Sequence, residues 1–193
     1  GFTATSIPEE YGGLGLGYLE LCVIAEELGR SLAPTPFSSS VYLASEAVLN
    51  FADDSTKQVY LPALAAGEKI GAFAHTESNT SPTESNIECS FSDGTLSGTK
   101  IAVVDGDIAG FYIVTAKNDS SVGLYLVDAS SDGVDITAQP TLDPSRSHAA
   151  VTFNQAKATE LKSDWSDVLN LLDRAAVLFL SLIHISEPTR RNS

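Results

Sequence analysis

The stretch LPALAAGEKIGAFAHTE, residues 61–77, is the point at which the hydrophobic pattern of this chain changes its period. Upstream of it, apolar residues recur at the spacing of amphipathic helices. Downstream, from Ile70 to about Ala158, the apolar segments become short and rich in strand-forming residues. Helices and strands are therefore segregated along the chain, which is typical of the α+β class and not of alternating βαβ units.

Three helices are predicted upstream of this point. The first covers residues 17–30 and the second residues 38–51, each with apolar side chains along one face. The third is expected to begin at an aspartate cap, Asp53 or Asp54, because a carboxylate can accept hydrogen bonds from the free amides of the first turn. It is expected to end at Gly67, since glycine readily adopts the left-handed conformation that closes a helix.

Seven strands are predicted downstream. The turn sequences Ser-Asp-Gly and Asp-Gly separate them at intervals that favour hairpins. Short strands at regular spacing are typical of a β-sandwich or a β-barrel. The predicted strands cover residues 71–76, 87–91, 95–104, 111–116, 123–128, 134–138 and 149–153.

The helical period returns near the end of the chain. Ser163 is expected to cap this last helix, with Asp164 and Asp167 in its first turn, where the helix dipole favours negative charge.

The composition excludes several classes of partner. The chain has 193 residues, of which 25 are acidic and 11 are basic, and its formal net charge is −14. Such a charge repels phosphate backbones and anionic lipids, which argues against nucleic acids and membrane surfaces. No apolar run is long enough to span a membrane. The two cysteines show no sign of pairing, so we expect a reducing, cytoplasmic location.

The glycine-rich segment IPEEYGGLGLG, residues 7–17, invites comparison with phosphate-binding loops. A dinucleotide loop reads Gly-x-Gly-x-x-Gly between a strand and a helix, but here the third glycine position is occupied by Tyr18. The Gly-Lys-Ser/Thr of a Walker loop is also absent from this segment. The segment is therefore interpreted as a structural turn that leads into the first helix.

This segment and the helix sequence after it, YLELCVIAEELGRSLAPTPF, resemble the amino-terminal helical domain of acyl-CoA dehydrogenases. The resemblance continues through residues 61–77, through LSGTKIAVVDGDIAGFYIVTA and through LDPSRSHAAVTF. Their order and spacing make the set specific, and they cover nearly all of residues 1–179. The resemblance implies an amino-terminal helical domain, a middle β domain and the first helix of a truncated carboxy-terminal helical domain.

The same resemblance implies a chemistry. Acyl-CoA dehydrogenases oxidise acyl-CoA thioesters to 2-enoyl-CoA; a carboxylate base removes the α-proton, and FAD accepts the β-hydrogen as hydride. Electrons pass on to an electron-transfer flavoprotein or a similar acceptor. The base and part of the flavin site lie in the carboxy-terminal domain and in a neighbouring subunit. We therefore expect an oligomeric parent enzyme, nominate no catalytic residue in this chain and expect the chain by itself to be inactive.

Two segments match the flavin-binding parts of the family. The first reads aromatic-x-x-Thr-Glu-Pro in the family, and here Phe73, His75 and Thr76 are the candidate contacts, with the Thr76 hydroxyl facing the flavin ring. Ser78 replaces the usual proline, and the Gly-Ser-Asp that commonly follows near the CoA portion is not visible.

The second segment reads Lys-x-Trp-Ile-Thr-Asn-Gly in the family and corresponds to residues 100–106. Ala102, Val103 and Val104 are the candidate contacts here. Ala102 stands where the family has a stacking tryptophan, and Val104 where it has a threonine that can donate a hydrogen bond. The resemblance then implies a flavin held mainly by backbone groups, or one bound weakly.

These replacements keep two alternatives open. One is a non-catalytic partner subunit of a heteromeric acyl-CoA dehydrogenase, which a missing carboxylate at the base position would reveal. The other is a β-rich binding module without flavin. The sequence does not specify whether the acyl group is linear, branched or steroid-like.

Other polar residues carry less weight. His75, His148 and His184 do not form metal-ligand spacing with the cysteines, so no metal site is predicted. Asp143 is expected to pair with Arg146 in a turn, and Ser145 completes the residue types of a catalytic triad without a supporting motif.

The predicted domains are a helical domain at residues 1–69, a β domain at 70–160 and one further helix at 161–179. Residues 180–190, LSLIHISEPTR, read as the translation of a transposase sequencing adapter, and residues 191–193 as read-through beyond it; residues 180–193 are therefore expected not to be natural sequence. The underlying nucleotide read would test this expectation.

Overall fold

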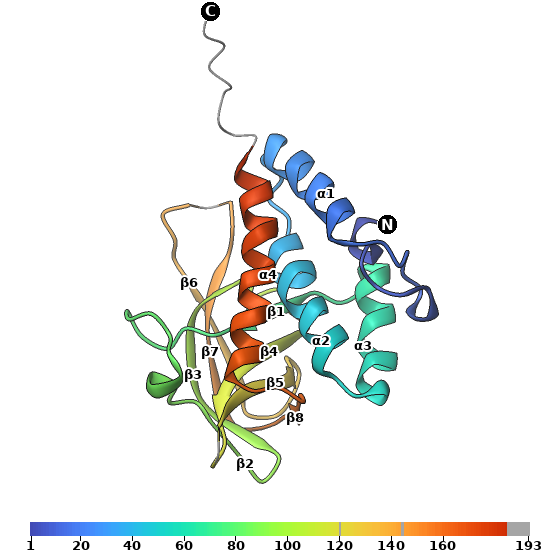
Figure 1. The fold of residues 1–193 in the computed structure, drawn as a ribbon. Helices are drawn as coiled ribbons and strands as arrows, with labels where there is room; N and C mark the ends of the chain where they lie inside the picture. Colours follow the sequence, from blue (N-terminus) through green and yellow to red (C-terminus); the bar gives the residue numbers. More distant parts are fainter. Residues whose placement is uncertain (120, 144, 185–193) are drawn as a thin grey trace, which may run out of the picture.

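The computed structural model describes residues 1–119, 121–143 and 145–184 (Figure 1). Its helices gather on one side of a curved β-sheet, and the last helix returns to pack beside the first (Figure 1). The helices are α1 (Tyr18–Arg30), α2 (Glu46–Phe51), α3 (Asp54–Ala66) and α4 (Trp165–His184), with a π-helix η3 (Ser38–Ser45) and short 3₁₀ turns η1 (Phe2–Ala4), η2 (Glu9–Tyr11) and η4 (Glu84–Asn86). The α+β expectation is confirmed.

Helix α3 begins and ends as its sequence predicts. The Asp53 carboxylate accepts a hydrogen bond from the Thr56 amide at 2.8 Å, and Gly67 closes the helix with φ of 74°. The apolar face of this helix, which includes Leu61 and Leu64, is buried in the core between the helices and the sheet.

Removal of the α3 cap provides a test of this local assignment. We expect Asp53→Ala to lower Tm by roughly 2–4 °C, because an amide of the first turn loses its acceptor. Asp54→Ala is the matched control, since Asp54 is the first helical residue and not the cap. Thermal unfolding followed by circular dichroism gives both values, and equal losses for the two variants would contradict the cap assignment.

Two helix predictions need correction. The second predicted helix is a π-helix, η3, followed by the α-helix α2, and seven of the eight residues of η3 are buried, so it has no single apolar stripe. The last helix is capped by Asp164, whose carboxylate accepts from the Asp167 amide at 3.1 Å. The Ser163 hydroxyl instead accepts from the Leu124 amide at 2.9 Å, because a neighbouring strand offers it a free donor.

The strands form one continuous hydrogen-bonded sheet in the order β6-β7-β3-β2-β4-β5-β8, with β1 added parallel to β4. The strands are β1 (Gly71–Ala74), β2 (Ser90–Ser92), β3 (Thr95–Val104), β4 (Phe111–Lys117), β5 (Val122–Asp128), β6 (Val134–Gln139), β7 (His148–Lys157) and β8 (Thr159–Glu160). All seven predicted strands are present, and β8 is an additional one.

The sheet buries both of its faces around the central strand β4. Phe111 and Ile113 face the helices, whereas Tyr112 and Val114 belong to a second core that also contains residues of β3 and β7. Strands β7 and β5, which lie next to the two ends of the hydrogen-bonded path, both contribute to this second core, so the sheet curves around it. This arrangement agrees with the expected sandwich or barrel class.

The hairpin expectation holds for one of its turns. Asp93 and Gly94 join β2 to β3, which are antiparallel neighbours. Asp132 and Gly133 lead from β5 to β6, yet β6 pairs with β7 and not with β5. A turn signal specifies that the chain reverses, but the partner of each strand depends on non-local packing.

The predicted domain boundaries at residues 69, 160 and 179 stay predictions. Helix α4 runs without a break past residue 179 to His184. The remainder of the predicted adapter-derived segment, residues 185–193, lies outside the described residues. No helix in the described part of the chain is both long and apolar enough to cross a bilayer.

Candidate functional site

A cavity of about 470 Å³ lies between the curved sheet and the helices. Five of the six sequence-predicted flavin contacts line it. The lining residues are Ser38, Ser39, Leu43, Phe73, His75, Thr76, Ile101, Ala102, Val104, Asp143, Arg146, His148, Leu172 and Phe179. The helical contributions, such as Leu43 and Leu172, carry no motif, so only their packing reveals them.

A backbone hydrogen bond joins the two predicted segments. The Ile101 amide donates to the Thr76 carbonyl at 2.8 Å, so the residues after β1 lie directly beside β3. Segments that are 25 residues apart in sequence are thereby brought onto one wall of the cavity.

A β-bulge in β3 turns the second segment towards the cavity. The pairing of β3 with β7 shifts between Lys100 and Val103, and Ala102 has φ of 51°, a left-handed conformation. The Ala102 amide leaves the ladder and donates to Gln139 Oε1 at 2.8 Å. As a result the neighbouring residues Ile101 and Ala102 both line the cavity.

Val103 is the predicted contact that does not line the cavity. Its side chain is 2% exposed and packs in the core on the other face of the sheet. The family motif covers residues 102–104 as one segment, but adjacent strand residues point to opposite faces.

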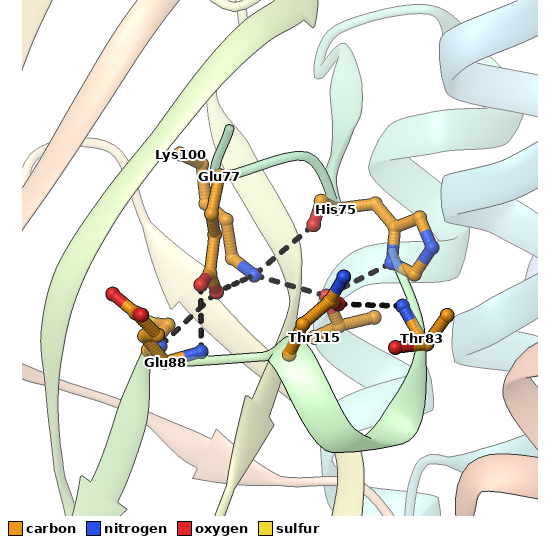
Figure 2. Close-up of polar contacts among 8 residues, drawn as sticks. His75, Glu77, Thr83, Glu88, Lys100 and Thr115 are labelled. Carbon is orange, nitrogen blue, oxygen red and sulfur yellow. Dashed lines mark hydrogen bonds and ion pairs between the residues drawn. The ribbon is translucent and has the colours of Figure 1, made fainter. Parts of the chain in front are cut away.

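Lys100 lies at the centre of a buried polar network beside the cavity (Figure 2). Its ammonium group donates to Glu77 Oε1 at 2.6 Å, to the Thr115 hydroxyl at 3.0 Å and to the His75 carbonyl at 3.3 Å. The Lys100 side chain is fully buried and that of Glu77 is 11% exposed. Glu77 also accepts from the backbone amides of Glu88 and Cys89.

His75 connects this network to the cavity. Its Nδ1 lies 3.0 Å from the Thr115 hydroxyl oxygen, and its ring is stacked on Trp165 with centroids 6.0 Å apart. Phe73 contacts the same ring, with centroids 5.5 Å apart. Burial, and then the positive charge of Lys100, lowers the pKa of His75 to about 4, although the charge of Glu77 acts in the opposite direction.

The lowered pKa of His75 predicts a pH-dependent stability. An unfolded histidine takes up a proton below about pH 6.5, whereas folded His75 stays neutral until about pH 4. The folded state therefore loses up to ~1.4 kcal/mol per pH unit across this window as the pH falls. Urea unfolding at several pH values measures the slope. His75→Gln is the control, and its free energy of unfolding should depend less on pH than that of wild type. The same slope in both proteins would contradict the assignment.

Arg146 and Asp105 form a second polar cluster at the edge of the cavity. The guanidinium binds both carboxylate oxygens of Asp105 and donates to the Ser38 hydroxyl at 3.1 Å. Asp105 also accepts from the Ser39 hydroxyl. The predicted pairing of Arg146 with Asp143 is therefore wrong, because the fold brings Asp105, which is only 3% exposed, to the guanidinium.

The residue types of a catalytic triad do not assemble. Asp143 and His148 line the cavity described above, whereas Ser145 lines a neighbouring one. The Asp143 carboxylate accepts from the Ser145 amide in a local turn. Within the described ranges, no three His, Cys, Asp or Glu side chains lie close enough to hold a metal ion.

The cavity combines apolar walls with few donors. Phe73, Leu43 and Val104 supply apolar surface, Thr76 supplies a hydroxyl and His75 supplies an imidazole. Such a lining suits a largely apolar ring system with hydrogen-bond acceptors at its edge.

Comparison with known proteins relates this geometry to a family. Residues 1–68 match the family model described as acyl-CoA dehydrogenase, N-terminal domain. A 2-methylacyl-CoA dehydrogenase of Solanum tuberosum is 38% identical over 123 residues, which are 60% of this chain and 30% of that protein. The chain belongs to the acyl-CoA dehydrogenase family. It spans about a third of the length of the curated relatives it matches.

Solved structures share the fold of this chain. The ChsE4-ChsE5 complex from Mycobacterium tuberculosis is 26% identical, with a TM-score of 0.79 over 93% of this chain and 50% of that one. Butyryl-CoA dehydrogenase from Megasphaera elsdenii is 22% identical, with a TM-score of 0.81 over 94% of this chain and 54% of that one, and this likeness shows the fold. The sequence-based family and fold predictions are confirmed.

Proposed function

We propose that this chain is part of a flavin-dependent acyl-CoA dehydrogenase, which converts an acyl-CoA thioester to 2-enoyl-CoA. The observation that carries the proposal is the meeting of both flavin-motif segments on one wall of a cavity. FAD, when bound, would supply the hydride acceptor. The electron acceptor of the reduced protein is proposed to be an electron-transfer flavoprotein or a similar partner, and the enzyme an oligomer.

The residues of the cavity fit a flavin ring, although by other contacts than the family pattern. Thr76 offers its hydroxyl, and the neighbouring rings of Phe73 and His75 supply aromatic surface that Ala102 lacks. Val104 supplies only an apolar wall, which excludes water but donates nothing. The catalytic base is proposed to lie outside this chain, as the family pattern implies. A cytoplasmic location stays a prediction.

The test uses the full-length protein, recovered from its source DNA and purified. We expect a flavin absorption band that bleaches when one of a panel of linear, branched and steroid-like acyl-CoAs is added without oxygen. The substrate that bleaches the band identifies the acyl class. A flavin band that no acyl-CoA bleaches would contradict the dehydrogenase proposal.

A second candidate is a partner subunit that does not itself hold the flavin. Ala102 and Val104 favour it, because they remove the stacking ring and the hydroxyl of the family pattern. The ChsE4-ChsE5 relative is described as a complex of two named chains. Full-length protein without a flavin band, and without a carboxylate at the base position, would favour this candidate. The third alternative, a binding module unrelated to flavin, is disfavoured by the family assignment.

Restoring a hydroxyl at position 104 tests whether this residue contacts the flavin. We expect Val104→Thr in the full-length protein to tighten FAD binding about 3- to 10-fold, because one added hydrogen bond contributes about 0.5–1.5 kcal/mol. Titration of the flavin-free protein with FAD, followed by flavin fluorescence, measures the change. Val59→Thr, on the exposed side of α3, is the matched control and should leave the affinity unchanged. No difference between the variants would contradict a flavin contact at position 104.

A further inference from the structure

We propose that Lys100 and Thr115 are positioning residues that hold His75 as the neutral Nε2–H tautomer, so that the cavity presents an N–H donor to its ligand. The ligand atom facing this donor would be a hydrogen-bond acceptor, such as a ring nitrogen or a carbonyl oxygen. The identity of the ligand as a flavin rests on the proposed function. The tautomer does not.

The protons of Lys100 are the starting point. An ammonium group has three N–H donors and no acceptor. Lys100 directs them at three different oxygens, those of Glu77, Thr115 and the His75 backbone (Figure 2). Glu77 also receives two backbone N–H bonds, so it faces the lysine as an acceptor and not as a donor. Every proton of the ammonium group is therefore used inside the network.

The role of Thr115 follows from that of Lys100. Its oxygen accepts from Lys100, so its own proton is free to be donated to another partner. The nearest described partner is His75 Nδ1, at 3.0 Å. A nitrogen that accepts this proton cannot carry one itself, and a neutral imidazole then carries its proton on Nε2. The alternative Nδ1–H tautomer would point two protons at the Thr115 oxygen, from His75 and from Lys100, and leave the hydroxyl proton without its nearest acceptor.

The second ring nitrogen is left for the cavity. It lies on the side of the ring away from Thr115 (Figure 2), and His75 lines the cavity. Among the described residues, none accepts a hydrogen bond from it. Stacking against Trp165 and Phe73 restricts rotation of the ring, so the direction of this donor is defined before a ligand arrives.

The charges around His75 favour its neutral form. Lys100 is the cation and Glu77 the anion whose charges act on the pKa of His75, and they are paired with each other. The other titratable residues that line the cavity are Asp143, Arg146 and His148. The buried carboxylates Glu77 and Asp105 are each paired with a cation, and the Asp143 carboxylate, which accepts from the Ser145 amide, is exposed to solvent.

The tautomer can be measured directly on this chain by NMR of ¹⁵N-labelled histidine side chains. The chain has three histidines, and His75→Gln identifies the signals of His75. At pH 7 we expect Nδ1 to show the chemical shift of an unprotonated nitrogen and Nε2 that of a protonated one. An imidazolium, or a protonated Nδ1, would overturn the proposal.

Variants of Thr115 test the positioning. Thr115→Ser retains the hydroxyl and should keep the pattern, whereas Thr115→Val removes the donor and should mix the two tautomers. Thr137→Val, at an exposed position of β6, is the control for a change of residue type alone. An unchanged His75 spectrum in folded Thr115→Val would overturn the role of Thr115. If that variant does not fold, a Nδ1–H signal in wild type or in Thr115→Ser would overturn it equally.

A titration of the full-length protein with FAD tests the ligand. We expect His75→Leu to weaken FAD binding about 10-fold or more and His75→Gln, which retains an N–H donor, to weaken it less. Equal affinities for wild type and His75→Leu would overturn the donor role. Failure of the proposed function is distinguishable, because a protein that binds no FAD would still display the His75 tautomer by NMR.

Discussion

Replacement of Glu77 by glutamine is expected to lower the free energy of unfolding by about 3–5 kcal/mol. The reason is the burial of Lys100, whose side chain has no exposed surface and whose charge is balanced by Glu77 alone among its three partners. Glutamine keeps the size of the side chain but removes the charge. The ammonium group would then be buried without an anion, and the cost of its desolvation would no longer be offset.

Urea unfolding of Glu77→Gln and wild type measures this loss. The matched control is the ion pair between Lys69 and Asp128, at 2.9 Å, in which both side chains are about one-third exposed. Lys69→Met should cost about 1 kcal/mol or less, because exposed ion pairs contribute little. A loss below 1 kcal/mol in Glu77→Gln would show that Lys100 does not depend on this carboxylate.

Asp105→Asn is expected to lower the free energy of unfolding by about 2–4 kcal/mol. Asp105 is buried, and its carboxylate binds Arg146 through both oxygens and also accepts from Ser39. Because Ser39 belongs to η3 and Asp105 follows β3, this cluster joins the helical part of the chain to the sheet beside the cavity. The variant should therefore weaken the packing around the cavity as well as lower the stability of the fold.

The control for this variant is Asp143→Asn, which changes the exposed carboxylate that the sequence predicts as the partner of Arg146. We expect its unfolding midpoint to remain that of wild type. Denaturant unfolding of the two variants side by side decides between the partners. A larger loss in Asp143→Asn than in Asp105→Asn would contradict the ion pair of the structure.

The sequence by itself predicts features that depend only on residues adjacent in the chain. Asp53 and Gly67 bound α3 as predicted, since a cap and a left-handed glycine depend on the adjacent backbone. The bounds of β3, Thr95–Val104, also match the prediction, because alternation and a preceding Asp-Gly turn are local signals. Family motifs likewise identified Phe73, His75 and Thr76, which the fold then brings to the cavity.

Only the tertiary structure determines which side chains contact one another at the site. Sequence separation hides that Arg146 meets Asp105, that Trp165 stacks on His75 and that Thr115 lies between His75 and Lys100. A bulge between Lys100 and Val103, which no local signal marks, places the neighbours Ile101 and Ala102 together at the cavity, whereas Val103 packs in the core on the opposite face. These features depend on which segments the sheet and helices bring together, and that choice is made by burial of the whole core rather than by the residues on either side.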